Sequence, residues 1–145
     1  GDVVIGRRVQ NLDHRKVTDD DKRPIIYRGV NVGCSPGLLD RFQAALSSWQ
    51  GVRVHIGTVL TSNTLVNSKT VVAQLRVDFP DAIAGEMEAA AVHEAATLGV
   101  KPDWIMVKGV SDWGYCKASH GQPQAARSAA DFVTHVVASG ALRRR

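Results

Sequence analysis

Acidic side chains follow two apolar runs of the chain. Glu86 and Glu88 stand two residues apart at the end of the run that begins at Ile83, and Asp112 follows the run 104–110. If these runs are neighbouring parallel strands, their acids meet at the carboxyl edge of one sheet, where open α/β folds bind ligands. Carboxylates in this arrangement suit two tasks, holding the hydroxyls of a sugar and protonating a leaving group. The spacing therefore predicts a ligand site at that edge.

Each acid also has a simpler structural interpretation. A carboxylate at the N-terminus of a helix is favoured by the helix dipole, which accounts for one of the two glutamates but less readily for both. Asp112 is also typical of a turn, because its short side chain bonds to nearby backbone. The joint occurrence of both motifs at successive strand ends favours a functional site.

The elements that must position these residues alternate between strands and helices. We expect strands near 3–5, 52–60, 83–87 and 104–107, helices near 35–49, 68–79, 89–98 and 123–138, and an exposed polar loop over 7–24. This alternation predicts an α/β fold with a mainly parallel or mixed central sheet flanked by helices.

The segment Gly33-Cys34-Ser35-Pro36-Gly37 matches the G-x-S-x-G pattern of hydrolase nucleophiles, with Asp112 and His120 or His135 as possible triad partners. That chemistry needs the backbone N–H of the residue after the serine for the oxyanion hole, and Pro36 has none. A helix that begins with Ser35 as N-cap and Pro36 at its first position explains the same residues.

The composition is that of an ordinary globular protein. The 145 residues are 44% hydrophobic and carry a net charge of +4, of which the arginines 143–145 supply +3, leaving +1. This charge is too small for a nucleic-acid surface. We expect a single domain in the cytoplasm, with no membrane segment and no signal peptide. Cys34 and Cys116 are expected to be reduced thiols, and the scattered histidines predict no metal site.

Several motifs together resemble the purine/uridine phosphorylase superfamily, and particularly its methylthioadenosine/S-adenosylhomocysteine nucleosidases. The motifs are Gly1-Asp2-Val3-Val4-Ile5, Gly57-Thr58-Val59 with Thr61-Ser62-Asn63, Phe79-Pro80-Asp81-Ala82, Gly85-Glu86-Met87-Glu88-Ala89-Ala90-Ala91 and Lys108-Gly109-Val110-Ser111-Asp112. They run through most of the chain. Trp113 and the segments around 122–123 and 129–133 are similar to nucleosidase-like domains of multidomain signalling proteins.

The resemblance implies cleavage of the N-glycosidic bond of a purine nucleoside, with no cofactor. Asp112 would be the general acid that protonates the leaving base, and Glu88 would hold the ribose hydroxyls. Met87 would pack on the sugar, Leu65 and Val66 would line the base pocket, and Glu86, Lys108 and Ser111 would be secondary members of the site. Leu65 replaces the usual Phe of the family and Asn63 its usual acidic residue. Trp113-Gly114 favours hydrolysis over phosphorolysis by resemblance only.

The chemistry of such a site agrees with these residue types. Cleavage passes through a positively charged, oxocarbenium-like sugar, which a carboxylate such as Glu88 stabilises. The base leaves readily only when protonated, which requires an acid whose pKa is raised. Lys108 lies four residues before Asp112 on the same strand and would lower that pKa if it were close. These two expectations conflict.

The family fold begins well before the strand that opens this chain. We therefore expect residues 1–145 to be the C-terminal part of a nucleosidase-like domain, with the water-activating group outside it. Such a part would leave a sheet edge unpaired, so we expect completion by a preceding segment or by homo-oligomers. Two functions remain open, an enzyme and a noncatalytic nucleoside-binding or assembly module.

Overall fold

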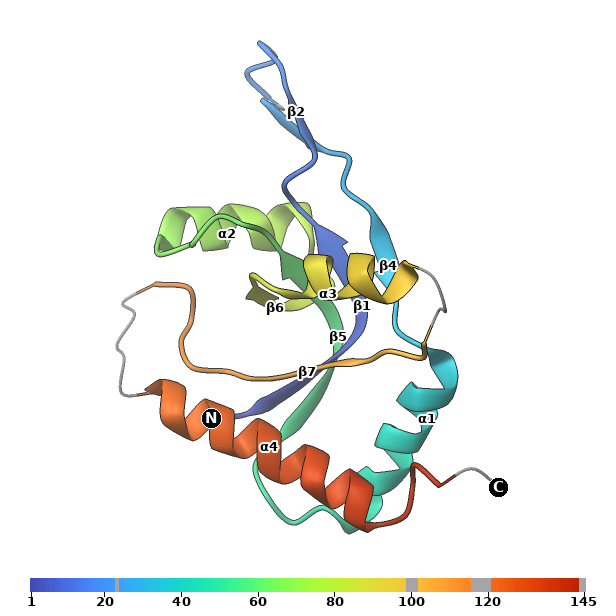
Figure 1. Ribbon diagram of the computed structural model, residues 1–145. Helices are drawn as coiled ribbons and strands as arrows, with labels where there is room; N and C mark the ends of the chain where they lie inside the picture. The colour runs from blue at the N-terminus through green and yellow to red at the C-terminus, as the bar shows by residue number, and fades with distance from the viewer. Residues whose placement is uncertain (23, 99–101, 116–120, 144–145) are drawn as a thin grey trace.

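The computed structural model describes residues 1–22, 24–98, 102–115 and 121–143 (Figure 1). Its elements in chain order are β1 (Val3–Asn11), β2 (Arg15–Val17), β3 (Ile25–Tyr27), β4 (Asn31–Gly33), α1 (Pro36–Ala45), the short 3-10 helix η1 (Leu46–Ser48), β5 (Val54–Thr61), α2 (Lys69–Asp78), β6 (Ala82–Glu86), α3 (Ala89–Thr97), β7 (Met106–Gly109) and α4 (Gln122–Ala138). The predicted α/β class, with a mixed sheet flanked by helices, is confirmed.

Strand β1 is the centre of the sheet. Along one edge it pairs in parallel with β5, which in turn pairs in parallel with β6. Along its other edge β1 pairs antiparallel with β7 through Val3–Gly6 and antiparallel with β4 through Arg8–Gln10. Strands β6 and β7 each have one hydrogen-bonded neighbour within the described part of the chain.

The expectation that the two acid-bearing runs are neighbouring parallel strands is wrong. Strands β1 and β5 lie between β6 and β7, and β7 runs antiparallel to β1 and therefore to β6. Glu86 and Asp112 consequently follow strands that point in opposite directions. Apolar runs indicate that a strand is buried, but they carry no information about its neighbour or its direction.

Strand β1 is longer than the sequence suggests. It continues through the polar residues to Asn11, past an irregularity between Gly6 and Arg8, and Gln10 is buried although it is polar. The expected exposed loop over 7–24 is therefore wrong in its first part, because pairing with β4 and β5 extends the strand. Beyond it, β2 and β3 form a separate two-stranded hairpin that projects from the body of the molecule (Figure 1).

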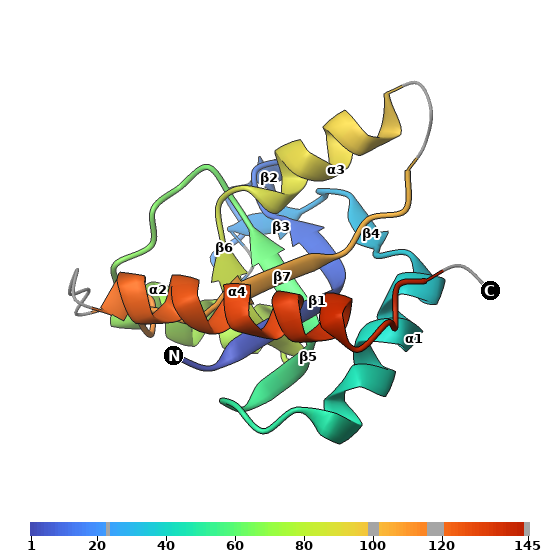
Figure 2. The same cartoon turned by 60° about the horizontal axis from the view of Figure 1, so that its bottom comes forward.

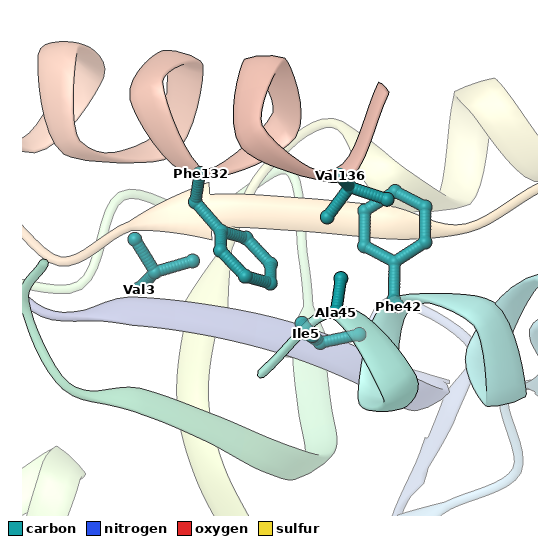
Figure 3. Packing of buried hydrophobic residues seen from close by; sticks show 6 residues of the cluster. All are labelled: Val3, Ile5, Phe42, Ala45, Phe132 and Val136. Carbon is teal, nitrogen blue, oxygen red and sulfur yellow. The ribbon is translucent and has the colours of Figure 1, made fainter. Parts of the chain in front are cut away.

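The hydrophobic core lies between the sheet and the pair of helices α1 and α4. Its buried members are Val3 and Ile5 of β1, Phe42 and Ala45 of α1, and Phe132 and Val136 of α4, whose side chains point toward one another (Figure 3). Phe132 is fully buried and packs edge-on against the rings of Phe42 and Trp49, with centroids 6.0 and 5.3 Å away. This core fixes α4 against the strands.

Helix α4 runs beside β7 and approaches it closely (Figure 1, Figure 2). A Cβ atom built on Gly109 would lie 1.9 Å from the carbonyl oxygen of Ala125, so only glycine fits at this position. Val107 faces the core under α1 and α4, and strand alternation turns Lys108 to the opposite face, where it meets the start of α3. None of the described helices is long and apolar enough to span a bilayer.

Candidate functional site

Glu86 ends β6 and holds the start of α3. Its Oε2 accepts hydrogen bonds from the backbone N–H groups of Glu88, at 2.7 Å, and Ala89, at 2.8 Å. These groups belong to the first turn of the helix, which has no internal acceptor for them. The structural interpretation of one glutamate as a helix-terminal residue is therefore confirmed for Glu86. Its Oε1 is buried and has no hydrogen-bond partner within the described residues.

Glu88 stands at the N-cap position of α3 and points to β7. Its Oε2 lies 2.6 Å from Nζ of Lys108, and 67% of its side chain is exposed. The hydrogen bond from Lys108 lowers the pKa of Glu88, against a smaller opposing effect of desolvation. Glu88 is therefore a carboxylate at neutral pH, with its charge partly balanced by Lys108.

A cavity of about 360 Å³ lies beside this ion pair. Its polar lining is Glu86, Glu88 and Lys108, and the rest is formed by Ala89 and Val92 of α3 with the segment 104–107 leading into β7. A mostly apolar hollow with a few convergent polar groups is the usual form of a small-molecule site. Three residues predicted from the sequence therefore come together here.

Asp112 lies in the loop after β7 and is half buried. One carboxyl oxygen accepts the N–H of Gly114 at 2.8 Å, and the other accepts the hydroxyl of Ser111 at 3.0 Å. Neither Asp112 nor Ser111 lines the cavity. Lys108 forms its ion pair with Glu88.

The other predicted pocket residues lie in the loop between β5 and α2 and at the start of α3. Leu65 is 63% exposed, Val66 is half buried and Met87 is 38% exposed. The N–H of Ser68 donates to the carbonyl of Gly114 at 3.0 Å, which ties this loop to the loop that carries Asp112. The predicted site thus forms two groups, one around the cavity and one around Asp112.

Two aromatic residues near the cavity were missed as site residues from the sequence. Trp104 lines the cavity and stacks at a tilt on His93 of α3, with ring centroids 5.1 Å apart, and Nδ1 of His93 is buried with no partner within the described residues. Trp104 resembles an ordinary strand residue in the sequence, and His93 an ordinary helical one. No sequence pattern joins them, because the contact is tertiary.

Asp13 was also missed. It follows β1 and accepts the hydroxyl of Ser62 at 2.7 Å and the N–H of Asn63 at 3.0 Å. These bonds fix the beginning of the loop that later carries Leu65 and Val66. A single Asp in a polar stretch gives no sequence signal for such a role.

Among the described residues, the hydrolase-type serine motif does not form a triad. The hydroxyl of Ser35 accepts the N–H of Trp104 at 2.9 Å, and it makes no side-chain cap on α1 although Pro36 is at the first helical position. His135 bonds instead to Ala45 and Ser48, at 3.1 Å each. His120 and Cys116 lie outside the described residues, among which no cluster of three metal-ligating side chains occurs.

Comparison with known proteins assigns these motifs to a family. The sequence profile of the phosphorylase superfamily matches residues 1–140. The 5'-methylthioadenosine/S-adenosylhomocysteine nucleosidase of Haemophilus influenzae (strain 86-028NP) is 30% identical over 125 residues, which are 82% of this chain and 51% of that protein. A death domain-containing ATP nucleosidase of Amphimedon queenslandica is 34% identical over 158 residues, covering 93% of this chain and 30% of that protein.

Solved structures agree with this assignment. The nucleosidase of Neisseria meningitidis in complex with methylthio-immucillin-A superposes with a TM-score of 0.74 at 25% identity, covering 95% of this chain and 62% of that one. The S-adenosylhomocysteine nucleosidase of Streptococcus pyogenes gives a TM-score of 0.76 at 22% identity, covering 99% and 61%, and supports the fold. The chain spans about half the length of several curated relatives that it matches.

Proposed function

The chain belongs to the phosphorylase superfamily, and on that premise we propose that it carries the sugar-holding and base-protonating side of a site that cleaves purine nucleosides. The observation that carries this proposal is the carboxylate of Glu88 at the cavity rim, held in place yet largely open to solvent. An open carboxylate accepts the two hydroxyls of a ribose, and the apolar wall of the cavity suits the rest of a nucleoside.

Glu88 would act in two ways. It would bind the sugar through hydrogen bonds from the ribose hydroxyls, which are strong because the acceptor is charged. Its negative charge would also stabilise the positive charge that develops on the sugar as the glycosidic bond breaks. The lowered pKa of Glu88 supports this role, because the residue stays ionised at neutral pH.

Asp112 would supply the proton to the leaving base. Its half-buried position and its bonds to Ser111 and Gly114 support a fixed orientation. The link between Ser68 and Gly114 ties the Asp112 loop to the loop of Leu65 and Val66, which supports the proposal that these loops together surround the base. Protonation lets the base leave as a neutral molecule rather than as a poor anionic leaving group.

The named relatives suggest the reaction and its first substrates. Because they are nucleosidases, we propose hydrolysis rather than phosphorolysis, with 5'-methylthioadenosine and S-adenosylhomocysteine as first candidates. Adenosine and ATP are further candidates, the latter from the Amphimedon relative.

The absence of Asp112 from the lining of the cavity favours a second candidate. Asp112 does not line the cavity, so a nucleoside held by Glu88 alone would be bound without being protonated. This second candidate is a noncatalytic nucleoside-binding or assembly module of a multidomain signalling protein.

The test measures base release and ligand binding in parallel. The protein is incubated with methylthioadenosine, adenosine, inosine and ATP, with and without phosphate. For the enzyme we expect release that Asp112→Asn lowers by at least about 100-fold, within the range of general acid catalysis, while binding persists. Asp131→Asn, an exposed change on α4, is the matched control and should leave release unchanged.

The remaining outcomes separate the two candidates. Binding without release under every condition supports the binding module and contradicts the enzyme. Absence of both binding and release contradicts the two proposals for this chain.

A further inference from the structure

We infer that Lys108 is a positioning residue, which holds the carboxylate of Glu88 in the place where it receives the sugar hydroxyls. The inference rests on the proposed function, because it concerns the same site. The relevant contact joins the start of α3 to β7 across the rim of the cavity, with Nζ of Lys108 2.6 Å from Oε2 of Glu88.

Glu88 is fixed at its two ends by different groups. Its backbone N–H donates to Oε2 of Glu86 at 2.7 Å, and its carboxylate is bound by Lys108. A glutamate side chain loses considerable rotational freedom when it is ordered, and here the ion pair provides that order before any ligand arrives.

The ion pair leaves most of the Glu88 side chain accessible to a ligand. Lys108 engages Oε2, and 67% of the Glu88 side chain remains exposed. A carboxylate accepts several hydrogen bonds through its two oxygens, so sugar hydroxyls can bind while Lys108 stays in place. Lys108 is therefore a support for the ligand contact rather than a competitor for it.

Lys108 also favours the charged form of Glu88. The groups that act on Glu88 are Lys108 of β7, the backbone of Met87 and the side chain of Glu86 of β6. The hydrogen bond from Lys108 is the largest of the effects that lower the pKa of Glu88. Removal of the ammonium group would raise that pKa, because the largest of the effects that lower it would be lost. As the pH is lowered, ligand binding that requires the ionised carboxylate would then begin to weaken at a higher pH than in the wild type.

The experiment compares Lys108→Met with Lys108→Arg, and uses Lys16→Met on the exposed strand β2 as the matched control. Affinity for methylthioadenosine is measured by calorimetry from pH 4 to 8. Lys108→Met should weaken binding about two- to fivefold at neutral pH, the range of an exposed ion pair. On acidification, the affinity of this variant should begin to fall at a higher pH than that of the wild type. Lys108→Arg should keep the wild-type affinity and the wild-type pH dependence, and Lys16→Met should change neither.

A second ligand and a spectroscopic titration separate this role from a merely structural one. Any binding of 2',3'-dideoxyadenosine, which lacks the two hydroxyls, should be the same for the wild-type protein and Lys108→Met. Carbon-13 NMR of the Glu88 carboxyl should show its pKa raised in Lys108→Met without any ligand.

Two results would overturn the inference. Wild-type binding with an unchanged affinity and pH profile in Lys108→Met contradicts the positioning role while the proposed function stands. No wild-type binding of methylthioadenosine at any pH contradicts the proposed function and the positioning role together, and the NMR titration then still reports whether the ion pair controls the charge of Glu88.

Discussion

The two sides of the sheet differ in how their residues are held. On the side of α1 and α4, buried aromatic and aliphatic side chains form a closed core around Phe132. On the side of α3, the helix has a single buried residue, Ala89. Its start is joined to the strands by an ion pair and by hydrogen bonds from backbone N–H groups to strand side chains, and it forms part of the wall of a cavity. One side is organised by apolar burial and the other by individual polar contacts.

This difference separates stability from ligand binding. Burial of apolar surface is strong but has no direction, so it fixes α4 without placing any group for chemistry. Hydrogen bonds and ion pairs contribute less free energy, but they fix the position of single atoms. On the side that carries Glu86, Glu88 and Lys108, we therefore expect ligand binding to tolerate a loss of overall stability better than a displacement of these polar groups.

The largest effect is expected from Phe132→Ala in the core. Phe132 is fully buried between Phe42 and Trp49, and its removal leaves a cavity that the neighbours cannot fill. The free energy of unfolding should fall by about 3–5 kcal/mol, measured by denaturant titration. Val137→Ala, an exposed position of the same helix, should change it by less than about 0.5 kcal/mol. Similar losses for both variants would contradict the assignment of the core to this side.

A smaller effect is expected from Glu86→Ala on the opposite side. The change removes the acceptor of the N–H groups of Glu88 and Ala89, and should lower the free energy of unfolding by about 1–2 kcal/mol. Hydrogen exchange of the first turn of α3 should accelerate more than exchange in α4. Glu94→Ala, exposed on the same helix, is the control. Uniform acceleration in both helices would show that Glu86 acts on global stability instead.

The smallest effect concerns the hydrogen-bonded pair of Asp2 and His55 at the beginning of β1 and β5. His55 Nε2 lies 2.8 Å from Oδ2 of Asp2, and this hydrogen bond lowers the pKa of Asp2 below its ordinary value of 3.8. A carboxyl group whose pKa is lower in the folded state contributes stability above its unfolded pKa and loses it as the pH falls through the folded pKa. Thermal unfolding below pH 4 should therefore depend less on pH in Asp2→Asn than in the wild type. An identical pH dependence in both proteins would show that the pair does not contribute.

The fold class and most helices were predictable because their signals are local. Apolar residues at helical spacing, Pro80 after α2 and the alanine-rich run before Leu98 mark elements whose bounds lie within a few residues of the expected ones. The continuation of β1 to Asn11 was not predictable, because its polar residues are in a strand only through pairing with β4 and β5. The same holds for the serine motif, where Ser35 binds Trp104 from far along the chain.

For the site, the sequence by itself determined the identities of the acidic residues, their assignment to strand ends and the family to which the chain belongs. Only the tertiary structure decided that Glu86 holds the start of α3, that Lys108 binds Glu88 and that β7 runs antiparallel to β1, apart from β6. The physical reason is that periodicity and motif spacing depend on near neighbours in the chain. Strand order and the partner of each charge depend instead on contacts between distant segments, which form only when the chain packs.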